Sequence, residues 1–400
     1  GGLYLEMVES VRRGGFALPE RIAGYTADGV PFAYPPLLFY AVAGLVAATG
    51  VDPVSLERVL PGLVSVAYLT PYWLVARRLL PSRRQAGLAT VLFAVTPDVL
   101  QWHLSAGGIV RAPAMFLTLA GIYAGIRLFE SGGRRWLLAS TALFALVFLS
   151  HPVYAAFFGL SYLVLFAGLD RSVAGLARGA AVALGGLAAT APWWLSVIAT
   201  HGADVFLGVN GTRTTLGGGL VRLGRQFGAP LVALDVITPF YVAAFAGGVY
   251  AATRRRYLLP AWMVLSSYVL GADRFTFVAG SMLAATLVVE VLLPAVQGWI
   301  PARRVPGGGR RDAVPGPSID YRRAATFLTL GVVVVGAGAV GAAYAGSGLD
   351  TAWDHSTTMP QTVDDDDRAA MAWVEANTAP SAEFAVVGDA AEWFPHYADR

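Results

Sequence analysis

The sequence predicts an all-α polytopic membrane protein, because apolar residues are too frequent and charged residues too rare for a soluble fold. Of its 400 residues, 56% are hydrophobic and 14% are charged, whereas a soluble domain carries about 25% charged residues. The chain has no cysteine and all 29 of its basic residues are arginine, which excludes disulfides, thiolate metal sites and lysine chemistry. The net charge of +3 gives no indication of a nucleic-acid partner.

Ten apolar stretches have the length of membrane helices, which need about 20 apolar residues. They lie at residues 58–80, 85–101, 112–130, 135–150, 153–169, 173–197, 229–252, 257–271, 275–299 and 324–346. A shorter stretch, 36–49, follows Pro35 and Pro36 and predicts an interfacial helix within a first outer loop, residues 1–57. The transmembrane domain then covers residues 58–346.

The arginines predict which ends of these helices face the cytoplasm. If residue 1 lies outside and the ten spans alternate, 18 of the 29 arginines fall on short inner loops, the asymmetry typical of cytoplasmic loops. We therefore expect a multi-pass protein of the plasma membrane. Residues 347–400 are predicted to begin an extracytoplasmic α/β domain, with a helix around Ala369–Val374 and a strand from Phe384 to Val387, cut off at the end of a fragment.

Unusual polar residues gather at the predicted outer helix ends: Asp98, His103, Arg111, His151 and Arg274. Ionisable groups at membrane depth are costly, so they indicate a functional site. A carboxylate with imidazoles can serve as a base or ligate a divalent metal such as Mg or Mn, and arginine suits phosphate. The plainer interpretation is that the carboxylate faces water, the histidines sit at interfaces or helix breaks, and the arginines reach outer headgroups.

One tyrosine of the first outer loop and two acids within the predicted spans allow more than one interpretation. Tyr34, in an aromatic and proline-rich approach to the interfacial helix, suits a lipid-linked or sugar substrate, or else an aromatic belt. Two mid-span acids, Asp235 and Glu290, look isolated, and Glu290, toward the inner half of its span, is expected to be a structural partner.

Several short motifs resemble the GT-C polytopic glycosyltransferases: FAYPPLLFY after the first outer loop, the TP…AGGIVRA turn, the LSHP break and DRF before a late span. That superfamily includes the dolichyl-phosphate-mannose protein mannosyltransferases, aminoarabinose transferases and oligosaccharyltransferases. The tail resembles archaeal and bacterial members labelled 6-pyruvoyl-tetrahydropterin synthase-related membrane proteins, a label that implies no pterin chemistry here. In those proteins an EWFP…R stretch opens the outer domain, which points to Glu392, Trp393 and Arg400.

The resemblance implies transfer of a sugar from a polyprenyl-phosphate carrier to a lipid, glycan or protein acceptor at the outer leaflet. It also implies an acid in the first outer loop, expected just before Gly1, and a second acid at the position of Asp98. The hypothesis is an inverting transfer in which Arg274 and Arg111 stabilise the departing lipid phosphate.

In this hypothesis Asp98 or His103 helps to activate the acceptor, and His151 orients the carrier. A divalent metal held by Asp98 and His103 is left open. Two alternatives remain: a lipid or glycolipid transporter or flippase that uses the same charges as a substrate path, and a non-catalytic membrane scaffold.

Overall fold

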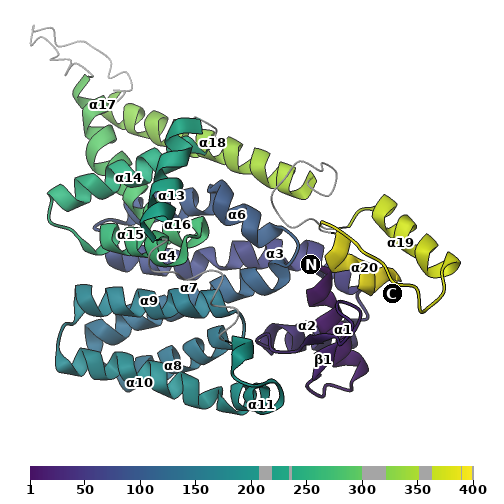
Figure 1. Ribbon diagram of the computed structural model, residues 1–400. Coiled ribbons are helices and arrows are strands. Elements are labelled where there is room, and N and C mark those ends of the chain that lie inside the picture. Colours follow the sequence, from purple (N-terminus) through teal and green to yellow (C-terminus); the bar gives the residue numbers. More distant parts are fainter. Residues whose placement is uncertain (207–218, 234–236, 300–320, 351–362, 389, 399–400) are drawn as a thin grey trace, which may run out of the picture.

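The computed structural model describes residues 1–400 except 207–218, 234–236, 300–320, 351–362, 389 and 399–400. Most of the described residues are helical, as the composition predicts (Figure 1). The helices of the first half are α1 (Gly2–Arg13), α2 (Leu37–Thr49), α3 (Pro53–Ala67), α4 (Leu69–Leu79), α5 (Arg83–Val95), α6 (Pro97–Leu104), α7 (Gly108–Ser131), α8 (Arg134–Phe148), α9 (Pro152–Leu169), α10 (Val173–Ala189) and α11 (Ala191–His201). The later ones are α13 (Gly219–Ala233), α14 (Thr238–Thr253), α15 (Leu258–Leu270), α16 (Asp273–Leu287), the π-helical turn η2 (Val288–Leu292), α17 (Leu293–Trp299), α18 (Tyr321–Asp350), α19 (Asp365–Asn377) and α20 (Ala390–Ala398).

Within the described ranges, five helical stretches are long and apolar enough to cross a membrane. They are Pro53–Leu79, Gly108–Ser131, Pro152–Leu169, Asp273–Gly298 and Ala324–Ala342. The pair α10 and α11, bent by 57°, makes a sixth if it is one span. A multi-pass membrane fold is therefore confirmed, and the predicted count of ten spans is not.

The predicted spans depart from the observed helices where proline interrupts an apolar run. The expected 85–101 span stops at Val95, because Pro97 holds Thr96 in an extended conformation (φ −68°, ψ 119°) and starts α6 in a new direction. The 173–197 span bends at Thr190, where Pro192 opens α11. The described part of the 229–252 span is divided between the end of α13 and α14.

The first loop folds onto one end of the helix bundle. The predicted interfacial helix is confirmed as α2, which ends at Gly50 in the left-handed conformation (φ +68°). Its first backbone N–H, on Leu37, donates to the Leu149 carbonyl of the α8–α9 turn at 2.9 Å. A short antiparallel ladder, β1 (Arg21–Ile22) with β2 (Val30–Pro31), closes the loop between α1 and α2.

The C-terminal segment is only partly as predicted. The helix expected around residues 369–374 is confirmed as α19, which a capping box between Asp364 and Asp367 opens. The strand expected from Phe384 to Val387 is wrong, because no described strand lies beside this segment to complete a ladder. The aromatic ring of Phe384 instead packs on Phe394 of α20, with centroids 5.1 Å apart. An outer α/β domain is thus not confirmed.

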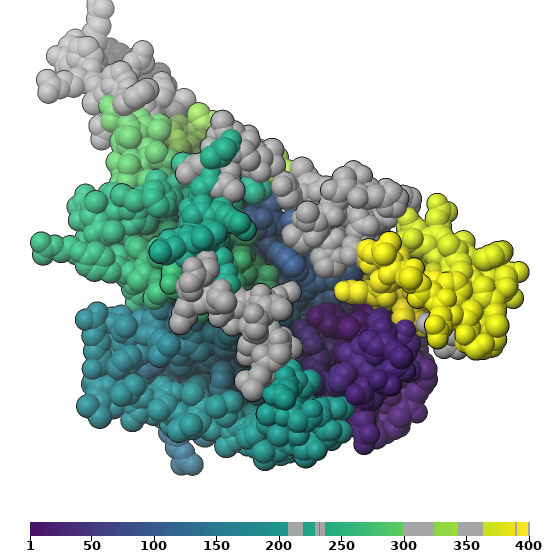
Figure 2. Space-filling model, viewed as in Figure 1, coloured from purple at the N-terminus to yellow at the C-terminus, as the bar shows by residue number. Residues whose placement is uncertain are grey.

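Helices α7 and α16 form the centre of the bundle. In the spans that contain α7 and α16, 72% of the 18-residue apolar segment is buried inside the protein. The corresponding share for the span in α18 is 6%. Helices α7 to α10 pack side by side, and α1, α2 and α20 lie beyond one end of them (Figure 1). In the space-filling view the C-terminal segment lies against the N-terminal segment (Figure 2). The first turns of α7 and α16 carry Arg111 and Arg274, so the best-packed helices position the predicted arginines.

Candidate functional site

Helix α6 directs its polar side chains in two directions. Asp98 and Trp102 are four residues apart and share one face of this helix. His103 follows five residues after Asp98, which turns it about 140° away around the axis. Asp98 and His103, which the sequence paired as a base or metal site, therefore do not converge on one point.

His103 joins α6 to α9. Its side chain is fully buried. The Nδ1 atom lies 2.7 Å from the carbonyl oxygen of Val99, and the Nε2 atom lies 2.8 Å from the hydroxyl of Tyr154. A neutral imidazole satisfies both contacts when Nδ1–H donates to Val99 and Nε2 accepts from Tyr154. Neither nitrogen is left to bind a metal in this arrangement.

Two buried arginines share the ring of Trp102. The guanidinium carbon of Arg111 lies 5.0 Å from the Trp102 ring centroid, and that of Arg274 lies 4.9 Å from it. Arg274 also lies 4.7 Å from the Phe275 ring and 5.5 Å from the Tyr154 ring. The exposed fractions of the two arginines are 5% and 7%. Such cation–π contacts stabilise a desolvated guanidinium but do not neutralise it.

Carboxylates lie near these arginines, Glu57 near Arg111 and Asp273 near Arg274, but no described carboxylate pairs with either guanidinium directly. Among the residues that the structure describes, no carboxylate forms an ion pair with Arg111 or Arg274. The Nε atom of Arg274 is buried and has no hydrogen-bond partner there. Because buried like charges repel each other and an unmet buried donor is costly, this pair is suited to bind an anion.

The turn between α6 and α7 sets the position of Arg111. Its Nε donates to the carbonyl oxygen of Gly107 at 3.1 Å, and its Nη2 donates to that of Ala106. Gly107 caps α7 in the left-handed conformation (φ +85°). A Cβ atom there would lie 2.7 Å from Nη2 of Arg111 and 3.0 Å from the ring of Tyr4. Only glycine allows the guanidinium to fold back over this turn.

The first loop brings tyrosines to the same end of the bundle. Tyr4 donates from its hydroxyl to that of Tyr34 at 3.1 Å. The ring of Tyr34 lies 5.7 Å from that of His151, which lies 4.9 Å from that of Tyr154. His151 also caps α9 by accepting from the N–H of Val153 at 3.3 Å. Burial raises the pKa of Tyr4 and of Tyr34, so both phenols stay protonated near neutral pH.

The face of α6 that bears Asp98 turns toward α14. The hydroxyl of Tyr241 donates to Oδ2 of Asp98 at 3.0 Å. At the start of α16, Asp273 accepts a hydrogen bond from the amide of Gln226, which also donates to Thr276 at 2.9 Å. An apolar groove of about 340 Å³ opens beside Tyr241, lined by Gly224, Phe227, Gly228, Tyr241, Val242, Phe245 and Ala246. A carboxylate thus lies next to an apolar groove.

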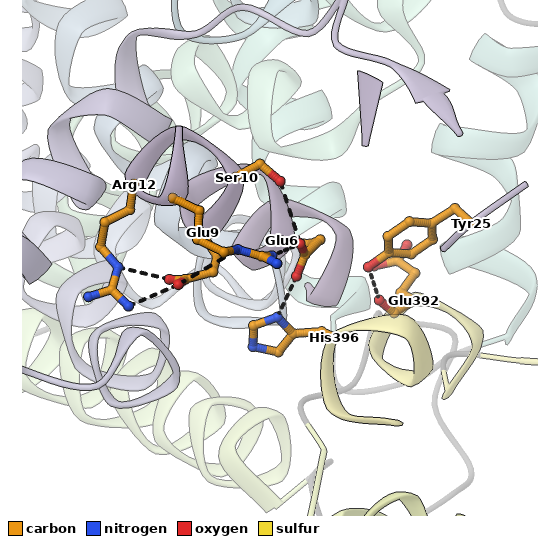
Figure 3. A network of polar contacts seen from close by, with 8 residues as sticks. Glu6, Glu9, Ser10, Arg12, Tyr25, Glu392 and His396 are labelled. Atoms are coloured by element: carbon orange, nitrogen blue, oxygen red, sulfur yellow. Dashed lines mark hydrogen bonds and ion pairs between the residues drawn. The ribbon is translucent and has the colours of Figure 1, made fainter. Parts of the chain in front are cut away.

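Of the predicted residues in the C-terminal segment, Glu392 lies where α20 packs against α1 (Figure 3). His396 contacts Glu6, with 3.0 Å between Nδ1 and Oε2, and Tyr25 donates to the carbonyl oxygen of Glu392 at 2.8 Å (Figure 3). Trp393 is 1% exposed and belongs to one apolar cluster with Ala106 of the α6–α7 turn. Its burial indicates a packing role behind the arginines. Arg400 lies outside the described residues.

Glu290 is a structural partner, as predicted, and it is not isolated. Its carboxylate accepts two hydrogen bonds from Nη1 of Arg256, at 2.8 and 3.0 Å, and one from Gln85 at 2.8 Å. The ion pair connects the α14–α15 loop to the π-helical turn η2, and the hydrogen bond from Gln85 connects α5 to the same turn, so Glu290 is a structural partner. Asp235 lies outside the described residues.

Sequence reasoning missed Trp102, Tyr154, Tyr241 and Glu57 of α3. Trp102 and Tyr154 stand four and three residues after predicted site residues, so helical spacing could have found them. Tyr241 and Glu57 come from α14 and α3, and no local pattern connects those helices to α6 or α7.

Similar folds occur among solved structures, although the sequence comparisons find no relative. No protein-family model matches the sequence, and no curated protein matches it. Solved structures do match. The archaeal oligosaccharyltransferase AglB from Archaeoglobus fulgidus, in complex with an inhibitory peptide and a dolichol-phosphate, has a TM-score of 0.63 and 15% identity over 99% of this chain. ArnT from Cupriavidus metallidurans, bound to undecaprenyl phosphate, has a TM-score of 0.58 and 14% identity over 100% of this chain.

The fold is GT-C-like. The fold that the resemblance predicted is thereby confirmed, since this chain folds like AglB and ArnT. The match covers 59% of the AglB chain and 80% of the ArnT chain, so this sequence spans little more than half the length of the oligosaccharyltransferase.

Proposed function

We propose that this chain carries the donor site of a membrane glycosyltransferase, which moves a sugar from a polyprenyl-phosphate carrier to an acceptor on the extracytoplasmic side of the plasma membrane. The observation that carries the proposal is the pair Arg111 and Arg274, buried over one tryptophan without an ion pair among the described residues. A phosphate would supply the missing negative charge, and guanidinium groups bind phosphate oxygens in a matched geometry.

The similar solved structures support a lipid-linked phosphate as this anion. AglB was solved with a dolichol-phosphate and ArnT with undecaprenyl phosphate. The apolar groove between α13 and α14 suits an isoprenoid tail, because it is lined by aromatic, aliphatic and glycine residues. Tyr34 and His151, at the same end of the bundle, suit the carrier head between tail and sugar.

The reaction needs charge stabilisation and a proton acceptor. The bond between the anomeric carbon and the phosphate oxygen breaks, and an acceptor oxygen or nitrogen forms the new bond to that carbon. The polyprenyl phosphate leaves with an added negative charge, which Arg111 and Arg274 stabilise. The acceptor gives up its proton to Asp98, which Tyr241 holds by a hydrogen bond. Attack from the side opposite the phosphate inverts the anomeric centre.

A divalent cation at Asp98 and His103 stays a prediction. Both ring nitrogens of His103 are already hydrogen-bonded. No group of three or more His, Cys, Asp or Glu side chains that could hold a metal ion occurs within the described ranges. Because His103 has no free ring nitrogen in this arrangement, no step of the proposed reaction passes through a metal. Assaying transfer before and after EDTA treatment tests the cation directly.

The test is release of polyprenyl phosphate from polyprenyl-phospho-sugars by the purified protein reconstituted in sealed lipid vesicles. We expect Arg274→Ala to slow release by about 100-fold or more, as loss of a preorganised charge does. Arg134→Ala, which removes an exposed arginine at the start of α8, should not change it. Unchanged release in Arg274→Ala would refute the donor site. Movement of intact lipid across the bilayer without release would favour a flippase, and neither activity a scaffold.

A further inference from the structure

A buried carboxylate at the turn that anchors Arg111 has no place in the reaction proposed above. Glu57 lies in α3 and is 3% exposed. Its Oε1 accepts a hydrogen bond from the backbone N–H of Gly107. Its Oε2 is buried and, among the described residues, has no hydrogen-bond partner. Burying a carboxylate with one oxygen unmatched is expensive, so this placement calls for a compensating role.

Glu57 and Arg111 hold the same turn from its two sides. The N–H of Gly107 donates to Glu57, and the carbonyl oxygen of Gly107 accepts from Nε of Arg111 at 3.1 Å. Arg111 also donates to the carbonyl oxygen of Ala106. The Gly107 N–H and the Ala106 carbonyl belong to one peptide plane, which moves as a rigid unit. If Glu57 released this N–H, the Ala106 carbonyl that anchors Nη2 of Arg111 could therefore rotate.

The position of Glu57 suits both the helix and the arginine. Gly107 is the residue before α7, so the carboxylate lies at the positive end of a 24-residue helix, where an anion is favourable. Glu57 and Arg111 attract each other, yet no ion pair forms between them in the described part of the chain. Glu57 can therefore orient Arg111 without occupying the guanidinium N–H groups that do not already donate to Gly107 and Ala106.

We propose that Glu57 is a positioning residue for the donor phosphate: it holds the Gly107 peptide so that Arg111 stays over Trp102. This inference rests on the proposed donor site. A residue that only stabilised the fold would weaken phosphate binding, if at all, independently of Arg111. A positioning residue acts through Arg111, and its effect disappears once that arginine is removed.

The experiment is a double-mutant cycle, with equilibrium binding of undecaprenyl phosphate to the purified protein as the readout. Glu57→Gln keeps an oxygen that accepts from Gly107 and should weaken binding less than about threefold. Glu57→Met keeps the volume but removes the acceptor, and should weaken binding about tenfold or more, as loss of a charged hydrogen bond does. In an Arg111→Ala background, Glu57→Met should add less than about a twofold loss.

Three results would overturn the inference. They are wild-type affinity in Glu57→Met, losses that multiply in the double variant, and a Glu57→Gln variant that binds as weakly as Arg111→Ala. If Glu57→Met does not fold, the affinity of Glu57→Gln still tests the inference. Glu290→Gln, which removes a membrane carboxylate paired with Arg256, is the matched control and should bind normally. Normal binding by Arg274→Ala would instead reject the donor site itself, and with it the basis of the inference.

Discussion

Replacing Trp102 by leucine tests whether one aromatic ring organises both arginines. The ring lies 4.9 Å from the guanidinium carbon of Arg274 and 5.0 Å from that of Arg111. Desolvated contacts of this kind contribute about 1–2 kcal/mol each, so their joint loss is about 2–4 kcal/mol. That range corresponds to about a 30- to 700-fold weaker affinity for a phosphate ligand. Arg274 keeps its contacts with Phe275 and Tyr154, which reduces the loss, and we expect at least about a tenfold loss.

The assay is calorimetric titration of the purified protein with undecaprenyl phosphate. Trp102→Phe retains an aromatic face and should lose only about threefold in affinity, because phenylalanine binds cations more weakly than tryptophan. Trp373→Leu makes the same substitution at an exposed tryptophan of α19 and should bind as the wild type. Wild-type affinity in Trp102→Leu, or an equal loss in the phenylalanine and leucine variants, would refute a shared cation–π platform.

The other predictions use different readouts. Gly107→Ala should lower the thermal midpoint, because alanine in the left-handed conformation costs about 1–2 kcal/mol. It should also weaken binding of undecaprenyl phosphate about tenfold, because the new Cβ would lie 2.7 Å from Nη2 of Arg111. Normal binding would contradict this. Asp98→Asn should slow sugar transfer by about 100-fold or more with unchanged affinity for undecaprenyl phosphate, and the reverse pattern would exclude a proton acceptor. Burial raises the pKa of Tyr34 above the value of about 10 that tyrosine has in an unfolded chain. The protonated Tyr34 therefore contributes fully to the free energy of unfolding below about pH 10, and this contribution is lost as the pH rises toward the folded pKa. The thermal midpoint should therefore fall less steeply between about pH 9 and pH 11 in Tyr34→Phe than in the wild type, and equal slopes would contradict this.

The sequence predicted the class of the fold and several of its elements, because composition and apolar length are global signals. The interfacial helix α2 and the C-terminal helix α19 occur close to where they were expected. The errors in the predicted spans share a cause. A count of apolar residues ignores backbone breaks, and Pro97 and Pro192 divide or bend helices that hydropathy alone joins. The strand at Phe384 failed because a strand needs a partner, which a local pattern does not reveal.

Charged site residues could be predicted, and their uncharged supports could not. Arg111, His151 and Arg274 are conspicuous in apolar stretches, and the structure gathers them around Trp102 and Tyr154. Trp102 is one of ten tryptophans, so its role depends on a packing partner in another helix. Glu57 was assigned to an outer loop that ends at residue 57, but α3 begins at Pro53 and carries its side chain into the interior.

The most direct test of the central claim is a structure of the protein with undecaprenyl phosphate by electron cryomicroscopy. A shared donor site predicts the phosphorus atom within about 5 Å of the guanidinium carbons of both Arg111 and Arg274, the spacing of direct arginine–phosphate hydrogen bonds, with both arginines still over Trp102. A phosphate bound elsewhere, such as at Arg254–Arg256 in the α14–α15 loop, would contradict the account.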